Sequence, residues 1–311
     1  MPHMNAFGEK WVFTSFGESH GIAVGGVLDG VPAGLHIDFD MIRSELERRA
    51  GRIKANGERV EAQGVSPRAA REPDEVEWLS GVLDGVTLGT PIAFIIRNND
   101  ARPEDYEALK HTYRTGHADK VYEQKYGIRD YRGGGRASAR ETAARVVAGA
   151  VAKQDLTQKG IRIQADLIQV GSETDPAKFA DVIGAYQREG DSIGGIIECR
   201  INGLPAGTGE PIFNKLQAEL AFAVMSINAC KGFEYGTGFA GVTQPGSAIN
   251  HLSGGISGGI SDGSEIVFRC VFKPTPSTPK AGVKGRHDAC VATRAVPVVE
   301  AMTALVLVNL I

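Results

Sequence analysis

The chain has little of what builds disulfide scaffolds or structural metal sites. Its four cysteines are Cys199, Cys230, Cys270 and Cys290, and no two of them have C-x-x-C spacing. This spacing favours neither a zinc site nor a redox motif, and so few cysteines in 311 residues make no disulfide framework. We therefore predict a protein of the reducing cytoplasm with no metal site.

A strong charge of one sign and long apolar runs are also missing. The 34 Lys and Arg residues against 37 Asp and Glu residues leave a formal net charge of −3. This balance gives no general attraction to nucleic acid or to a membrane surface. The apolar stretch from Ala295 to Ile311 contains Glu300 and is short for a bilayer span, so we predict a buried helix. No signal peptide is visible, and residues 1–4 (MPHM) are expected to be a cloning remnant before a natural start at Met4.

Glycine, in contrast, is abundant, and arginine accompanies it in one stretch. The 40 glycines are near twice the usual share of about 7%. Residues 131–145 read YRGGGRASARETAAR, in which three glycines allow positive φ angles and a close approach to a ligand. Ser138 and Glu141 fit a capping box, which predicts a helix from Ala139. A glycine loop before a helix N-terminus suits an anion, and guanidinium groups bind phosphates and carboxylates. The arginines of this stretch are Arg132, Arg136, Arg140 and Arg145. A capped helix with solvated arginines is the alternative interpretation.

Strands and helices are mixed without a regular βαβ repeat. We predict strands over residues 10–16, 22–28, 75–83, 91–97, 162–170, 195–201 and 266–272. Helices are expected up to Arg49 after an N-cap at Asp38 or Asp40, over 104–110, 174–189 and 214–227, and at the C-terminus. Residues 51–71 are polar without an apolar period and are predicted to be a loop. The fold class is therefore α+β, and no break in composition divides residues 1–311 into two domains.

Two histidines lie in polar, glycine-flanked segments: His20 in GESHG and His117 in GHAD. Histidine is the side chain best suited to exchange protons near neutral pH, although a single loop histidine is often merely exposed. In residues 285–288 (GRHD) an Arg and an Asp could hold an anion and orient a proton carrier, or form a surface ion pair. No Walker motif is present, and no nucleophile-elbow or G-x-G-x-x-G motif follows a segment that we predict to be a strand. The residues alone thus indicate a cytosolic protein with an arginine-rich anion site.

Three long stretches resemble the signature regions of the chorismate synthase family. They read FTSFGESHGIAVGGVLDGVPAG, HADKVYEQKYGIRDYRGGGRASARETAARVVAGA and KGRHDACVATRAVPVVEAM. Between them EPDEVEWLSGVLDG, MSINACKGFEYGTGF, GGISGGIS and KPTPS resemble the same family, so that the likeness extends from Phe7 to Val308. The resemblance implies a β-α-β sandwich, usually a homotetramer, that converts 5-enolpyruvylshikimate 3-phosphate (EPSP) to chorismate and phosphate. This anti-1,4-elimination requires reduced FMN, without net redox change.

The resemblance also implies a role for individual positions. His20 matches a histidine that protonates the departing phosphate, and His117 one that protonates reduced FMN. Ser19, Ser138 and Asp288 match a relay that helps flavin N5 to take the C6 proton of the substrate. The positions that match substrate contacts are Arg49, Arg114, Arg140 and Arg286, and Arg49 also matches a nicotinamide contact in members that reduce their own flavin with NADPH. The positions that match FMN contacts are Arg136, Ala137, Ser138, Asn228, Ala229, Gly258, Lys273, Pro274, Thr275, Pro276, Ser277 and Arg286.

The chain departs from the family pattern at several points. After Arg49 the usual short Arg-Pro-Gly-x-Ser stretch is replaced by a longer segment, residues 50–70, in which Arg52 and Lys54 are both candidates for a second arginine. Ala137 replaces a usual serine, and Ala289 a usual proline. Segments around 171–175, 239–250 and 279–284 are shorter than usual, and the usual C-terminal tail is absent. Two other functions remain open: a flavin reductase that uses the same anion site, and a non-catalytic homologue that binds FMN or phosphate.

Overall fold

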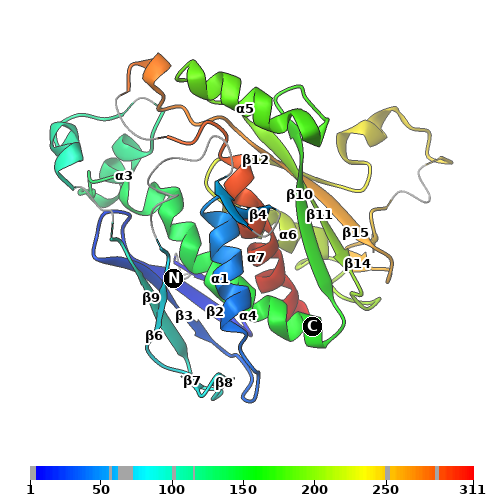
Figure 1. Ribbon diagram of the computed structural model, residues 1–311. Helices are drawn as coiled ribbons and strands as arrows, with labels where there is room; N and C mark the ends of the chain where they lie inside the picture. The colour runs from blue at the N-terminus through cyan, green and yellow to red at the C-terminus, as the bar shows by residue number, and fades with distance from the viewer. Residues whose placement is uncertain are drawn as a thin grey trace.

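Two antiparallel sheets enclose a layer of helices in the computed structural model (Figure 1). The structure describes residues 5–55, 58–61, 73–99, 103–114, 116–248, 253–283 and 287–311. The first sheet has the order β1 (Ala6–Phe7), β2 (Val12–Phe16), β3 (Ala23–Asp29), β9 (Ile92–Arg97) and β6 (Val76–Trp78). The second has the order β10 (Arg162–Val170), β11 (Gly195–Asn202), β15 (Ile266–Phe272) and β12 (Cys230–Tyr235). This arrangement is a β-α-β sandwich, as expected.

Helices α4 (Thr142–Gln158) and α7 (Ala292–Leu310) form the centre of the helical layer. Helix α4 packs on the first sheet and α7 on the second, and the two helices pack on each other (Figure 1). Their contact is close, because a Cβ atom at Gly149 would lie 2.3 Å from the Cα of Ala301. Small residues on both helices therefore allow one apolar core to connect the two sheets. Helices α1 (Phe39–Arg49) and α6 (Leu216–Met225) complete the layer.

Helix α7 is the buried C-terminal helix that the apolar run predicts. It is long and apolar enough to cross a membrane by length and composition alone. However, 78% of its apolar window is buried inside the protein, where it contacts α4, β10 and α6. A helix that is apolar on nearly all sides and surrounded by protein is a core helix.

A cluster of buried charges joins three helices of this layer, and we call it the helix-layer cluster. Both oxygens of Glu300, which is 2% exposed, accept from Arg48, at 2.8 and 2.9 Å. Lys153 Nζ lies 2.6 Å from Glu300 Oε2 and 3.1 Å from Glu45 Oε1. The backbone N–H of Ala165 also donates to Glu300, at 2.9 Å. Burial alone would raise the pKa of Glu300, but Arg48 and Lys153 outweigh it and the pKa lies below its usual value.

Local signals in the sequence placed most of these elements correctly. Strands β2 and β3 pair as a hairpin, and Asp38 is the N-cap of α1, accepting from the N–H of Met41 at 2.9 Å. The Ser138 hydroxyl accepts from the N–H of Arg140 at 3.3 Å, so Ser138 does cap the helix start. The first turn there is the 3₁₀ helix η3 (Ala139–Glu141), and α4 proper follows it.

The loop predicted over residues 51–71 is wrong in its first part. Strands β4 (Arg52–Ala55) and β5 (Glu58–Glu61) pair in antiparallel register, with Arg52 opposite Glu61. The sequence between these strands, Asn56-Gly57, is a strong hairpin-turn signal. Our sequence analysis predicted a loop instead, because the surrounding residues have no apolar period. Residues 56–57 and 62–71 lie outside the described residues.

Sequence analysis also missed helix α3 (Asp119–Tyr126) and strand β12. Of the eight described residues of α3 only Asp119 is buried, so the helix has no apolar stripe to reveal it. Strand β12 starts directly after Ala229, which has a φ of +67°. The remaining elements are α5 (Phe179–Arg188), η1 (Pro103–Leu109), η2 (Gly135–Ala137), η4 (Pro176–Lys178), η5 (Gly238–Thr243), η6 (Pro279–Ala281) and the hairpins β7 (Val82–Leu83) with β8 (Val86–Thr87) and β13 (Ile256–Ser257) with β14 (Ile260–Ser261).

Candidate functional site

A cavity of about 900 Å³ lies beside the N-terminal end of α4. Its wall combines segments far apart in the sequence: β2, residues 114 and 116–118, the glycine loop (residues 133–135), and parts of residues 226–229, 273–277 and 287–294. A cavity of this volume holds a ligand of cofactor size. The predicted site residues that line it are His20, Arg49, Arg114, His117, Arg136, Ala137, Ser138, Arg140, Asn228, Ala229, Lys273, Pro274, Thr275, Pro276, Ser277 and Asp288.

The glycine loop lies directly against both predicted histidines. Gly133 and Gly134 have φ angles of +62° and +89°. A Cβ atom at Gly133 would lie 1.9 Å from Nδ1 of His20, and one at Gly134 would lie 2.6 Å from Cε1 of His117. Any side chain would collide at either position, so these glycines are required by close approach as well as by conformation.

The first histidine, His20, is 4% exposed and held at Nδ1. The hydroxyl of Ser19 lies 3.0 Å from Nδ1 and donates to the carbonyl of Gly133 at 3.1 Å. The single hydroxyl proton of Ser19 can serve only one of these two contacts at a time, so Ser19 can hold His20 at Nδ1 in either imidazole tautomer. The ring of Tyr106 packs edge-on against the imidazole, with 4.7 Å between ring centroids. Ser19 thus contacts the cavity wall through His20.

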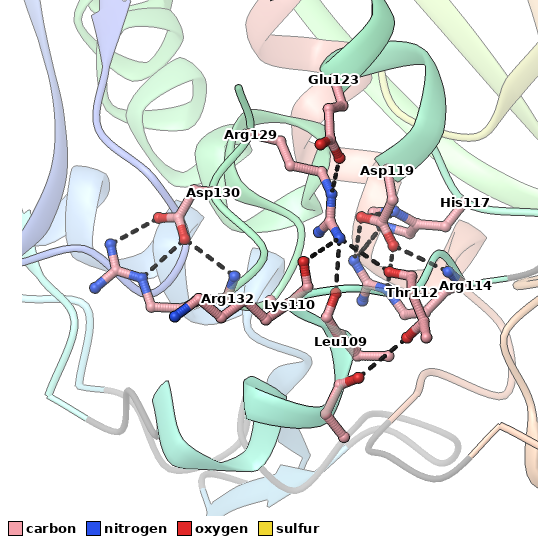
Figure 2. A network of polar contacts seen from close by, with 12 residues as sticks. Leu109, Lys110, Thr112, Arg114, His117, Asp119, Glu123, Arg129, Asp130 and Arg132 are labelled. Atoms are coloured by element: carbon pink, nitrogen blue, oxygen red, sulfur yellow. Dashed lines mark hydrogen bonds and ion pairs between the residues drawn. The ribbon is translucent and has the colours of Figure 1, made fainter. Parts of the chain in front are cut away.

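The second histidine, His117, belongs to a small ionic network (Figure 2). Its Nδ1 lies 2.9 Å from Oδ1 of Asp119. Arg114 donates to the same carboxylate through Nε and Nη2, at 2.9 and 3.0 Å, and its Nη2 also lies 3.1 Å from His117 Nε2. Burial alone would raise the pKa of Asp119, but the hydrogen bonds from His117 and Arg114 hold this pKa well below its usual value. Asp119 therefore stays ionised and orients both side chains.

Two buried arginines share one carboxylate, and we call this group the site cluster. Arg49 and Arg140, 2% and 5% exposed, both pair with Asp74, which is 4% exposed. Arg49 Nη1 lies 3.3 Å from Oδ2 of Asp74, and Arg140 Nη1 makes a short contact with Oδ1. Burial alone would raise the pKa of Asp74, yet Arg140 and Arg49 keep it below its usual value.

Further contacts hold both guanidinium groups in the cavity wall. Asn98 Oδ1 accepts from Arg140 Nε at 2.8 Å. The carbonyl of Ala139 accepts from Arg49 Nη2 at 2.8 Å, and the hydroxyl of Thr142 accepts from Arg49 Nε at 3.1 Å. Buried, hydrogen-bonded arginines have fixed orientations and present positive charge to a ligand without an ordering cost.

Another side of the cavity carries most of the predicted FMN positions. Arg136 donates to the hydroxyl of Ser15 at 2.9 Å and to the carbonyl of Gly17 at 3.2 Å, which anchors it on the end of β2. Asn228 donates to the carbonyl of Ala137 at 3.2 Å, and this bond joins the glycine-loop segment to the residues before β12. Residues 273–277 follow β15 directly.

Three buried polar atoms of this wall have no hydrogen-bond partner among the described residues. They are Oδ1 of Asn228, Oγ of Ser277 and Nε2 of His287, and all three residues line the cavity. Leaving a buried polar atom unpaired costs about 1–3 kcal/mol. A polar ligand that bonds to them would recover this cost, and a flavin nucleotide has hydrogen-bonding groups along its whole length. The residues present therefore fit such a group.

Asp288 is not the N-cap of α7, which corrects one of two readings that the sequence allowed. Among the described residues no side chain caps this helix, whose N-cap position is Val291. Asp288 instead pairs with Arg294 Nη1 at 2.8 Å, and Arg294 Nε donates to the carbonyl of Arg49 at 2.9 Å. Asp288 is thereby connected to the segment that carries Arg49, on the wall of the cavity.

Two predicted site residues are not found in the cavity wall. Gly258 lies in the exposed turn between β13 and β14, outside the residues that line the cavity. Arg286, predicted for both substrate and FMN, lies outside the described residues. Sequence analysis missed Asp74, Asn98, Asp119 and Arg294, which orient the predicted side chains. Only Asp119 had a local signal, its position two residues after His117.

Comparisons with known proteins agree with this architecture. The family model of chorismate synthase matches residues 11–311. The chain is 45% identical to the chorismate synthase of Christiangramia forsetii over 353 aligned positions, which cover 98% of this chain and 96% of that protein. It is also 45% identical to the chorismate synthase of Phocaeicola vulgatus, with 98% and 97% covered. Because the aligned span is longer than the 311 residues of this chain, the relatives carry segments that it lacks.

A solved structure shares the fold. A crystal structure titled as chorismate synthase superposes with a TM-score of 0.76 at 30% identity, covering 98% of this chain and 92% of that one. Family model, relatives and structure extend over nearly the whole chain. The chain belongs to the chorismate synthase family.

Proposed function

We propose that the protein is a chorismate synthase, which eliminates phosphate from EPSP by an anti-1,4-elimination to give chorismate. One observation carries the proposal: a single cavity combines buried arginines with two histidines on either side of a glycine loop. EPSP has two carboxylates and one phosphate, and oriented guanidinium groups bind such anions by charge-assisted hydrogen bonds. Arg49, Arg114 and Arg140 are the substrate contacts in this proposal, and Arg286 is a fourth by sequence.

The same cavity is proposed to hold reduced FMN. Arg136, Ala137, Ser138, Asn228, Ala229 and residues 273–277 would bind it, and the unpaired polar atoms of Asn228 and Ser277 support this assignment. When bound, reduced FMN supplies electron density for phosphate departure and an acceptor, N5, for the C6 proton of the substrate. The protein's part is to hold both ligands together and exclude bulk water.

Proton movements are assigned to groups that the cavity already positions. His20 is proposed to protonate the departing phosphate, and its Nδ1 contact with Ser19 fixes the ring for this task. His117 is proposed to protonate reduced FMN, with Asp119 holding the ring. Ser138 and Asp288 are proposed to assist transfer of the C6 proton, and the Ser138 hydroxyl can do so while it caps η3.

The proposal also covers the compartment, the assembly, the partners and the flavin reductant of the protein. We propose that the protein acts in the cytoplasm as a homotetramer, without nucleic-acid or membrane partners. If it reduces its own flavin, NADPH is the expected reductant and Arg49 its expected contact. The near-neutral charge of the chain and the buried position of its long apolar helix α7 support the proposed absence of nucleic-acid and membrane partners.

A second candidate is a homologue that binds FMN or phosphate but does not release phosphate from EPSP. One observation favours it: the chain lacks segments that its relatives carry. A flavin reductase is the third candidate, and it would oxidise NADPH in the absence of EPSP. The histidines and arginines gathered in the cavity favour the synthase over both.

The deciding experiment measures phosphate release from EPSP under anaerobic conditions. Chemically reduced FMN is supplied first, and NADPH with oxidised FMN second. Release in the first assay supports the synthase, and release in the second adds flavin reduction by the protein itself. Binding of FMN without phosphate release would overturn the proposal in favour of the non-catalytic homologue. Steady NADPH oxidation without EPSP, and no phosphate release, would favour the reductase.

A further inference from the structure

The segment that carries Arg114 and His117 has little apolar anchorage. It runs from the end of η1 through α3, where Asp119 is the single buried residue among those described. Two of its large side chains, Val121 and Tyr126, are 59% and 57% exposed. Burial of apolar surface therefore contributes little to holding this segment in place. Its polar contacts must fix it instead.

Arg129 makes several of these contacts, and its side chain is only 5% exposed (Figure 2). Its Nη2 donates to the carbonyls of Leu109 and Thr112, at 2.7 and 2.9 Å. Its Nε donates to Glu123 on α3 at 3.0 Å. The guanidinium carbon also lies 5.2 Å from the ring centre of Tyr113. One planar group thus connects the chain before Arg114 with the helix after His117.

We propose that Arg129 is a positioning residue for the reaction, holding the segment from which Arg114 and His117 reach the cavity. This inference rests on the proposed function. Asp119 joins Arg114 to His117 inside the segment, but only Arg129 connects the two ends of the segment in the network drawn in Figure 2. A reacting group displaced by about 1 Å can lose about 100-fold in rate, so the position of this segment decides activity.

The test replaces Arg129 by lysine, which keeps the charge and the aliphatic stem. A single ammonium group cannot reach Glu123 and two carbonyls together as the planar guanidinium does. Glu123→Gln is a second variant that weakens only the contact to α3. The matched control is Arg200→Lys on β11, whose guanidinium also bridges two groups, Glu198 and Glu265, but lies on the surface.

Three measurements are made on the full-length protein: amide hydrogen exchange, phosphate release from EPSP with reduced FMN, and a thermal melt. In Arg129→Lys we expect exchange over residues 109–126 to accelerate about tenfold or more, because charge-assisted hydrogen bonds are lost. We expect kcat/KM to fall about 100-fold, while the melting temperature stays near that of the wild type. Glu123→Gln should also accelerate exchange and lower kcat/KM, but by less. Arg200→Lys should change neither exchange over residues 109–126 nor kcat/KM.

Two results would overturn the positioning role of Arg129. One is unchanged exchange over residues 109–126 in Arg129→Lys. The other is accelerated exchange combined with wild-type turnover, because the contacts would then hold the segment without serving the reaction. A wild-type protein that releases no phosphate is a separate failure, that of the proposed function. In that case the exchange comparison still decides whether Arg129 holds the segment.

Discussion

The site cluster and the helix-layer cluster both bury charges, and they differ in what those charges face. In the helix-layer cluster, Glu300 and Glu45 are paired with Arg48 and Lys153, between helices. In the site cluster, one carboxylate, that of Asp74, is shared by two guanidinium groups that line the cavity. The charges of the first cluster face other protein groups, whereas the cations of the second line the cavity.

This difference indicates how a protein can bury cations beside a cavity at little cost in the free energy of unfolding. Removing one member of a buried pair leaves a charge without compensation, at a cost of about 3–5 kcal/mol. Asp74 compensates part of the positive charge of Arg49 and Arg140 while orienting both. Changes in the site cluster should therefore affect ligand binding and turnover, whereas changes in the helix-layer cluster should affect the free energy of unfolding.

The largest effect is expected from the histidines beside the site cluster. His20→Ala and His117→Ala should each reduce turnover of EPSP by about 100- to 10,000-fold, because proton transfer is worth that much. Both variants should remain folded, as judged by their thermal melts. The exposed His36 serves as the control, and its alanine variant should keep full turnover. Wild-type turnover in both cavity variants would remove the assignment of proton carriers.

The second prediction concerns the free energy of unfolding, which should depend on the helix-layer cluster. Glu300→Gln should lower the free energy of unfolding by about 3 kcal/mol, because Arg48 and Lys153 then retain only Glu45. Chemical denaturation measures this loss, and turnover per folded molecule should be unchanged. Glu265→Gln, on an exposed ion pair with Arg200, should cost less than about 1 kcal/mol. A Glu300→Gln protein that is stable but inactive would contradict the division between the clusters.

A smaller effect tests binding by the site cluster. Arg140→Ala should weaken the binding of EPSP by about 1.5–3 kcal/mol, the value of a charge-assisted hydrogen bond. Titration with EPSP in the presence of FMN measures the change. Arg188→Ala, on the exposed side of α5, is the control and should bind as the wild type does. Equal and negligible effects at both positions would count against the substrate role of Arg140.

The smallest effect concerns acid stability. The pKa of Glu300 is lowered in the folded protein, so the folded state binds fewer protons than the unfolded chain near the usual pKa of 4.5. Its stabilising contribution is complete above that pH and is lost as the pH falls through the lowered value. Unfolding free energies measured at decreasing pH should therefore decline more steeply for wild type than for Glu300→Gln. Parallel curves would show that Glu300 is not responsible.

Prediction from sequence succeeded where the cause of a structure is local. The β2–β3 hairpin, the Asp38 and Ser138 caps and the apolar α7 all follow from neighbouring residues in the chain. It failed where local pattern is weak. The polar helix α3 has no apolar period, and the β4–β5 hairpin was masked by the polar composition of its surroundings.

The sequence by itself determined the family resemblance and many of the residues that line the cavity. Only the tertiary structure decided which groups orient them. Asp74 reaches Arg49 and Arg140 across 25 and 66 positions of the chain, and Arg294 reaches Arg49 across 245. Local preferences depend on adjacent residues, whereas these ion pairs and this hydrogen bond form because two sheets pack on one helical layer and bring distant segments together.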